Sequence, residues 1–153
     1  MMRLLGYGIA LLAVLGVVAW IWINFMPIDP QRWHQDPATA KRSTAPNNIV
    51  YAPAGINAPD LEAAVFDDVP EALIARFAEI ALAAPRVREL TTGAANYRTF
   101  VQRSALMGFP DYISVKAVAV EGGASLVVYS RSQYGYSDWG VNRKRVESWT
   151  SRL

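Results

Sequence analysis

The chain has 153 residues, of which 52% are hydrophobic, with no cysteine and a formal net charge of +2. This length allows one domain and a short additional segment, and the lack of cysteine excludes disulfides and thiol-linked lipids. The basic residues are dispersed with no continuous run, which argues against nucleic acid as a partner.

The first predicted element is an uncharged apolar run from Leu4 to Ile23. As a helix it would be about 30 Å long, close to the hydrocarbon thickness of a bilayer. It is longer than the apolar region of a signal peptide, and Trp20 and Trp22 stand where a cleavage site would need small residues. We therefore expect residues 1–26 to form an uncleaved anchor in the lipid bilayer. A buried helix of a soluble core is the alternative, but such a helix needs a larger domain around it.

The orientation of this anchor does not follow from a count of basic residues, because Arg3 precedes it while Arg32, Lys41 and Arg42 follow. Single anchors with so short a leading tail commonly leave that tail in the cytoplasm. We therefore expect the domain to lie outside the cytoplasm.

Residues 27–48 are predicted to form a Pro-rich stalk, because proline blocks helix and favours extended backbone. Its single histidine, His34, has Asp29 and Asp36 nearby but no further His or Cys, so we expect no metal site. Trp33 is expected to pack against the domain or the lipid surface, and His34 to hydrogen-bond locally.

The globular domain is predicted to cover residues 49–153 and to begin with short extended segments. Ile49–Tyr51 fits an edge strand, and Ala63–Asp67 fits a second extended piece. A helix follows, with Asp68 as N-cap, Glu71 at the capping-box position and Pro85 as its stop.

Four longer strands come next, in two pairs. They are expected at residues 86–92, 97–104, 112–120 and 124–132, with loops at Gly93–Asn96 and Gly122-Gly123. Alternation in the last two strands gives one apolar face and one mixed face. The predicted fold class is α+β: an N-terminal transmembrane helix, then a two-layer domain with an antiparallel sheet of about four to six strands and two helices.

The second helix of the domain is predicted near the C-terminus, capped by Ser137 or Asp138. The stripe expected to face the sheet contains Trp139, Asn142, Val146, Trp149 and Leu153. The residues expected on other faces are Lys144, Arg145 and Arg152, with Arg143 in an i,i+4 pair with Glu147. A buried asparagine must be hydrogen-bonded, so we expect the Asn142 amide to tie the helix start to the preceding loop.

One residue pattern occurs at the ends of two predicted strands, in residues 103–112 and 131–139. Each copy has an Arg-Ser pair, a glycine-aromatic turn, and then Asp followed by an aromatic residue. If the strands are neighbours, the arginines and aspartates would meet at one rim of the sheet. The candidate ligand-binding residues are Arg103, Ser104, Asp111, Arg131, Ser132, Asp138, Asn142 and Arg143.

Three interpretations of this rim are open. The arginines and aspartates could pair with one another, they could bind a carboxylate or phosphate, or they could take part in catalysis. No histidine or cysteine lies in the predicted domain, and it has no Ser-x-x-Lys or Gly-x-Ser-x-Gly pattern. We therefore assign no catalytic residue and expect no cofactor.

The charges of the chain are nearly balanced but segregated. Residues 29–85 carry eight acidic and four basic side chains, whereas residues 86–153 carry ten basic and five acidic ones. The basic part could form a face for anionic head groups or an acidic partner, or the two parts could pack together and neutralise each other.

The chain contains three sets of motifs: Asp29-Pro30, Trp33-His34 and Asp36-Pro37; Val101–Ser104 with Met107–Tyr112; and Ser130–Ser132, Gly135, Ser137-Asp138, Gly140–Arg143 and Arg145-Val146. Together they resemble the bacterial family known as domain of unknown function 1499. The resemblance implies a small anchored or exported protein, and it carries no established activity. With the anchor, it leads us to expect a single-pass protein of the bacterial inner membrane with its domain in the periplasm.

The first functional hypothesis is a non-catalytic binding or assembly module that engages an envelope protein or a small anionic ligand through Arg103 and Arg131. The second is a hydrolase or other enzyme acting on lipid or cell-wall material, with Asp111 or Asp138 as general base. The third is a carrier of a small apolar ligand, which would need an enclosed cavity between sheet and helices.

Overall fold

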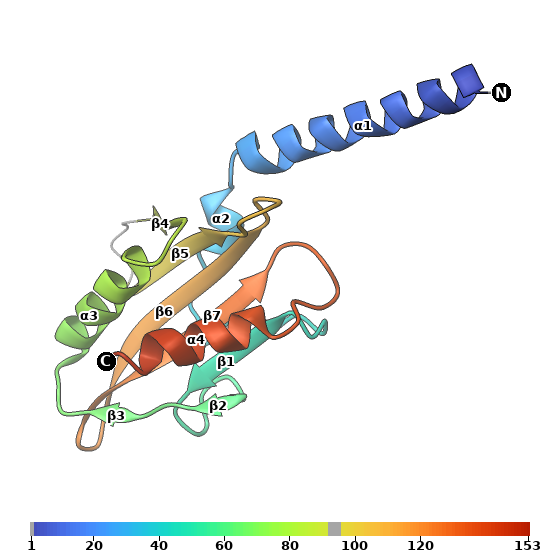
Figure 1. The fold of residues 1–153 in the computed structure, drawn as a ribbon. Helices are drawn as coiled ribbons and strands as arrows, with labels where there is room; N and C mark the ends of the chain where they lie inside the picture. Colours follow the sequence, from blue (N-terminus) through green and yellow to red (C-terminus); the bar gives the residue numbers. More distant parts are fainter. Residues whose placement is uncertain (1, 92–95) are drawn as a thin grey trace.

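The structure is a computed structural model that describes residues 2–91 and 96–153. The chain begins with helix α1 (Met2–Phe25), which leaves one end of the domain (Figure 1). Its segment Leu5–Phe25 is apolar and long enough to cross a membrane, and it is not buried against the rest of the chain. This agrees with the apolar helix predicted from the sequence.

The domain is built on one mixed, mostly antiparallel sheet of seven strands within the described residues. Its strands are β1 (Asn48–Ala52), β2 (Leu61–Glu62), β3 (Val65–Phe66), β4 (Val87–Thr91), β5 (Tyr97–Arg103), β6 (Pro110–Val120) and β7 (Gly123–Ser132). Their order is β2-β1-β7-β6-β5-β4, with β3 paired to β7 and only β1 and β2 parallel. The α+β class is confirmed. The sheet exceeds the expected strand number because two two-residue strands, β2 and β3, are added to it.

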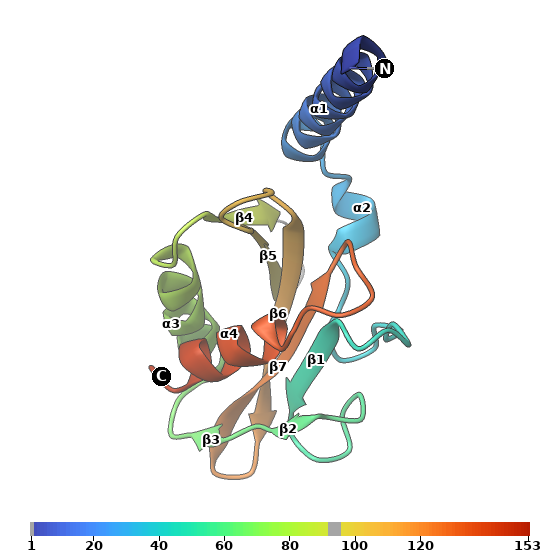
Figure 2. The same cartoon turned by 45° about the vertical axis from the view of Figure 1, so that its right-hand side comes forward.

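Helices α3 (Pro70–Leu82) and α4 (Val141–Thr150) cover one face of this sheet (Figures 1 and 2). Phe77 of α3 lies at the centre of the core, with its ring centroid 5.8 Å from that of Trp149 and 6.3 Å from that of Phe100. Ile113 and Val115 of β6 also enter this core, as their alternation predicted. The helices and the sheet therefore form the two layers that the sequence indicates.

The other face of the sheet is partly covered by residues 29–47, which we call the strap. It begins with the short helix α2 (Pro30–Trp33). The Trp33 ring stacks on Tyr112 with centroids 4.0 Å apart, and the Asp36 carboxylate pairs with Lys116 Nζ at 2.6 Å. The segment predicted as a stalk therefore packs on the domain, because its side chains find partners on the sheet. The division of the chain at residues 26 and 48 stays a prediction.

Both helix starts differ from the prediction. The N-cap of α3 is Val69, because the Asp68 carboxylate accepts hydrogen bonds from Val69 N and from Arg76. The N-cap of α4 is Gly140, and Trp139 before it has a positive φ of 55° and a side chain that is 90% exposed. The prediction that Trp139 faces the sheet is wrong, because helical spacing starts only after this turn.

The two predicted loops between the longer strands have different outcomes. Most of the loop at Gly93–Asn96 lies outside the described residues. In the second hairpin, Val120 pairs with Gly123, so the turn residues are Glu121 and Gly122. Gly123 lies so close to the Phe66 carbonyl that a Cβ there would overlap it, which explains the need for glycine.

Candidate functional site

The sequence predicted that two arginines and two aspartates share one rim of the sheet. They do lie at one end of it, since β5, β6 and β7 are neighbours; the four residues are Arg103, Arg131, Asp111 and Asp138. Their side chains nevertheless fall into separate groups. Asp111 and Asp138 lie on the face covered by α4. Arg131 lies on the face covered by the strap, and Arg103 contacts the end of α1. The predicted single cluster is therefore wrong, because alternation along the strands sends these side chains to different sides.

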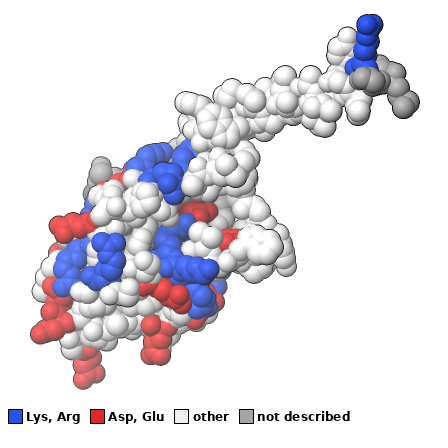
Figure 3. All heavy atoms as spheres, in the orientation of Figure 1, with Lys and Arg blue, Asp and Glu red and all other residues white. Residues whose placement is uncertain are grey.

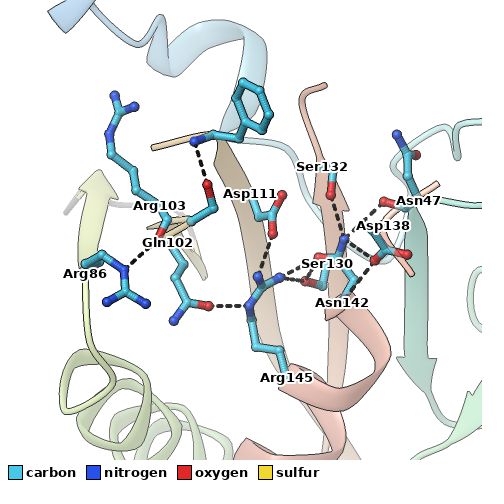
Figure 4. Close-up of polar contacts among 12 residues, drawn as sticks. Asn47, Arg86, Gln102, Arg103, Asp111, Ser130, Ser132, Asp138, Asn142 and Arg145 are labelled. Carbon is cyan, nitrogen blue, oxygen red and sulfur yellow. Dashed lines mark hydrogen bonds and ion pairs between the residues drawn. The ribbon is translucent and has the colours of Figure 1, made fainter. Parts of the chain in front are cut away.

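Arg145 of α4 is the centre of the group on the helix face (Figure 4). Its side chain is 6% exposed and bonds Asp111 Oδ2 through Nη2 at 2.5 Å. Nε donates to Gln102 Oε1 at 2.5 Å, and Nη1 donates to Ser130 Oγ at 3.1 Å. The expectation that Arg145 projects elsewhere is wrong. The sequence signal that could have found it is its spacing three residues after the buried Asn142, on the same helix face.

Asn142 connects the same helix to three other segments. Its Nδ2 lies 2.7 Å from Asp138 Oδ2, 2.9 Å from Ser132 Oγ and 3.1 Å from the Asn47 carbonyl oxygen. Its Oδ1 accepts from Ser130 Oγ at 2.6 Å. The prediction that this amide ties the helix start to the preceding loop is confirmed.

This buried polar network has the chemistry of a structural joint. Asp111 is bound by Arg145, and Asp138 accepts the backbone N–H groups of Gly140 and Asn142. Neither carboxylate is left available as a general base, and the hydroxyls of Ser130 and Ser132 are engaged as well. The arrangement holds α4 on the sheet.

Arg131 is a charged side chain buried between the strap and the sheet. It is 5% exposed, lies between the rings of Trp33 and Tyr129, and donates to the Trp33 carbonyl at 2.6 Å. Within the described ranges no carboxylate forms an ion pair with it. Burial therefore lowers the pKa of Arg131 to about 10, and burial also raises the pKa of neighbouring Tyr112 to about 12. This guanidinium fastens the strap to the sheet.

His34 links the strap to β5 and gives the domain a pH dependence. Its Nδ1 lies 3.0 Å from Thr99 Oγ1, its ring stacks on Tyr97 at 4.3 Å, and burial lowers its pKa below 6.5. The unfolded chain then binds this proton more readily than the folded one, so stability is full above about pH 6.5 and falls as the pH drops through the folded-state pKa.

We expect the wild-type domain to unfold more easily at about pH 5 than at about pH 8. Because His34 is the only histidine, His34→Gln should remove the part of this change that lies near neutral pH. Denaturant unfolding of both proteins across this range measures the difference. If the free energy of unfolding changed equally with pH in both proteins, His34 would not be the source of the pH dependence.

The remaining candidates, Ser104 and Arg143, make local contacts. Ser104 Oγ accepts from Phe109 N at 3.0 Å and closes the turn between β5 and β6. Arg143 is exposed and lies 3.6 Å from Glu147, which is the predicted i,i+4 pair. A ligand-binding role for any of these residues stays a prediction.

A basic pocket of about 370 Å³ lies where the domain meets α1. Arg86, Arg88 and Arg103 line it together with Trp20 of α1 and Leu106. Across residues 2–91 and 96–153, no carboxylate forms an ion pair with these three arginines. Figure 3 shows basic side chains at this junction and acidic side chains at the far end of the same face. Arg86 and Arg88 were missed from the sequence, because nothing local distinguishes them from ordinary strand residues.

These features define a class: a small α+β domain behind an apolar helix, closed by a C-terminal helix through a buried arginine. The chain belongs to the family described as "Protein of unknown function (DUF1499)", whose model matches residues 34–153. The resemblance seen in the sequence is thereby confirmed, and the match includes most of the strap. Searches of curated proteins and of solved structures gave no match.

Proposed function

We propose that this protein is a membrane-anchored, non-catalytic binding module of the bacterial envelope. In this proposal α1 spans the inner membrane, the domain lies in the periplasm, and the basic pocket binds an anionic group. The observation that carries it is the set of three guanidinium groups, Arg86, Arg88 and Arg103, without an ion-pair partner in the described structure. Unpaired arginines at a shared pocket are suited to carboxylate or phosphate oxygens.

Two of the arginines that line this pocket are also restrained by hydrogen bonds. Arg103 donates through Nη1 to the carbonyls of Ile23 at 2.9 Å and Gly108 at 2.8 Å, so its guanidinium is fixed before any ligand arrives. Arg86 Nε donates to the backbone carbonyl of Arg103 at 3.0 Å, which also restrains the Arg86 side chain. Such pre-organisation lowers the entropy cost of binding.

The other two hypotheses have less support. An enzyme would need an available base, and both Asp111 and Asp138 are engaged. A carrier of an apolar ligand would need space between sheet and helices, where Phe77, Phe100 and Trp149 pack.

We expect sn-glycerol 3-phosphate to bind the full-length protein in a neutral detergent and to raise its midpoint of thermal unfolding. In Arg86→Gln/Arg88→Gln the affinity should fall by about ten-fold or more for each arginine, because a hydrogen bond to a charged group contributes about 1.5–3 kcal/mol. Calorimetric titration measures this affinity.

The matched control is Lys144→Gln/Arg152→Gln, which removes the same charge from exposed positions of the C-terminal segment. Its affinity should stay near that of the wild type. Equal losses of affinity in both double variants would show that binding depends only on net charge. An absence of binding by the wild type would refute the anionic site. The anchor is tested separately: alkaline carbonate should leave the full-length protein in the membrane fraction, and detergent should release it.

A further inference from the structure

The loop of residues 104–109, which we call the junction loop, is bonded directly to the last turn of α1. Asn24 Nδ2 donates to the Met107 carbonyl at 3.1 Å, and Arg103 bridges the carbonyls of Ile23 and Gly108. Gly108 has a φ of +70°, and a Cβ there would overlap the Asn24 side chain as it stands, so both the backbone and the contact favour glycine. Since the apolar span of α1 ends at Phe25, these contacts hold the junction loop at the level where a spanning helix leaves the hydrocarbon.

The junction loop exposes apolar side chains beside that helix. Leu106 is 84% exposed and Met107 is 39% exposed. The Phe109 ring lies 5.5 Å from that of Tyr134, so the loop between β7 and α4, residues 133–140, contacts the junction loop. Figures 1 and 2 show both loops at the end of the domain from which α1 leaves. Single exposed apolar residues are ordinary, but these adjoin an apolar helix, and tyrosine is typical of membrane interfaces.

The charges at the two ends of the domain differ in sign. Arg86, Arg88 and Arg103 lie at the end next to α1. Glu121 occupies the β6–β7 turn at the opposite end, and Asp67 lies beside it because Phe66 pairs with Ala124. An anionic surface would therefore attract the end near α1 and repel the other end.

We propose that this end of the domain docks on the bilayer that holds α1, with Leu106 at the interface and Arg86 and Arg88 on the phosphates of anionic phospholipids. The inference rests on the proposed anchor and names the anionic group of the basic pocket as a phospholipid head group. The domain then lies against the membrane and does not stand away from it on a stalk. The packing of the strap on the sheet is consistent with this, since it leaves only a few residues between α1 and the domain.

The absence of cysteine allows a direct test with single labels on the full-length protein. Leu106→Cys and, as matched control, Glu121→Cys carry the same fluorophore; both positions are exposed. The proteins are placed in nanodiscs of phosphatidylcholine with phosphatidylglycerol, with and without brominated lipid. Brominated lipid should quench the fluorescence of the label at residue 106 and leave that of the label at residue 121 unaffected.

A second comparison tests the arginines. Adding Arg86→Gln/Arg88→Gln to Leu106→Cys should reduce the ratio of docked to undocked protein by about 25-fold, about five-fold for each arginine. For the protein with both arginines, nanodiscs of phosphatidylcholine alone should reduce the ratio of docked to undocked protein by a similar factor. Quenching that is equal in both lipids and in both proteins would overturn the role of anionic lipid.

The docking proposal and the proposed function fail in different ways. A label at residue 106 that stays in water, in protein that enters nanodiscs and resists carbonate, would refute docking while leaving the anchor intact. Extraction by carbonate would refute the anchor itself. Binding of sn-glycerol 3-phosphate in detergent is measured without a bilayer, so it tests the basic pocket independently of docking.

Discussion

Replacing Arg145 with alanine is expected to lower the free energy of unfolding by about 3–5 kcal/mol. The substitution leaves the Asp111 carboxylate, whose side chain is only 15% exposed, without its partner at 2.5 Å. It also removes the donors to Gln102 and Ser130. Denaturant unfolding of the full-length protein in detergent, followed by circular dichroism, measures the loss.

The matched control for this substitution is Arg143→Ala in the same helix. Arg143 is exposed and its pair with Glu147 spans 3.6 Å, so the free energy of unfolding should change by less than about 0.5 kcal/mol. Similar effects of the two substitutions would show that the network around Arg145 does not hold α4 on the sheet.

Replacing Trp149 with alanine should have an effect of comparable size, about 3–5 kcal/mol. The Trp149 side chain is buried in the core, with its ring 5.8 Å from Phe77 in an edge-to-face arrangement. Its removal leaves a cavity between α3 and α4 that neighbouring side chains fill only in part. Thermal and denaturant unfolding both report this change.

Trp139→Ala provides the comparison, since it removes the same side chain from the same part of the sequence. Trp139 is 90% exposed, so its loss should change the free energy of unfolding by no more than about 0.5 kcal/mol. Equal destabilisation by the two substitutions would contradict the position of the turn before α4.

The local elements of this fold follow from the sequence because the signals that set them are local. Alternation placed Ile113 and Val115 on the buried face of β6, and helical spacing placed Val146 and Trp149 on the buried face of α4. The need to satisfy a buried amide predicted the bonds of Asn142. Each of these inferences uses residues within a few positions of one another.

The candidate site was harder to predict because its residues come from distant segments. Arg145 looks like any exposed helical arginine until Asp111 of β6 and Gln102 of β5 are brought to it. Arg131 was assigned to the wrong group because the sequence gives no sign that the strap returns to cover it. Trp139 was misplaced by extending a helical period through a turn that two positive φ values define.

The pairing of β1 with β7 has a consequence for how this protein is made. Its register joins residues that are 77 to 83 positions apart, from Tyr51 with Val128 to Asn48 with Arg131. The edge of β1 that pairs with β7 therefore has no partner until the ribosome has released β7, long after α1 has emerged. Long-range pairing of this kind slows folding and prolongs exposure of unpaired strands. We therefore expect the domain to complete its fold only after β7 has been synthesised.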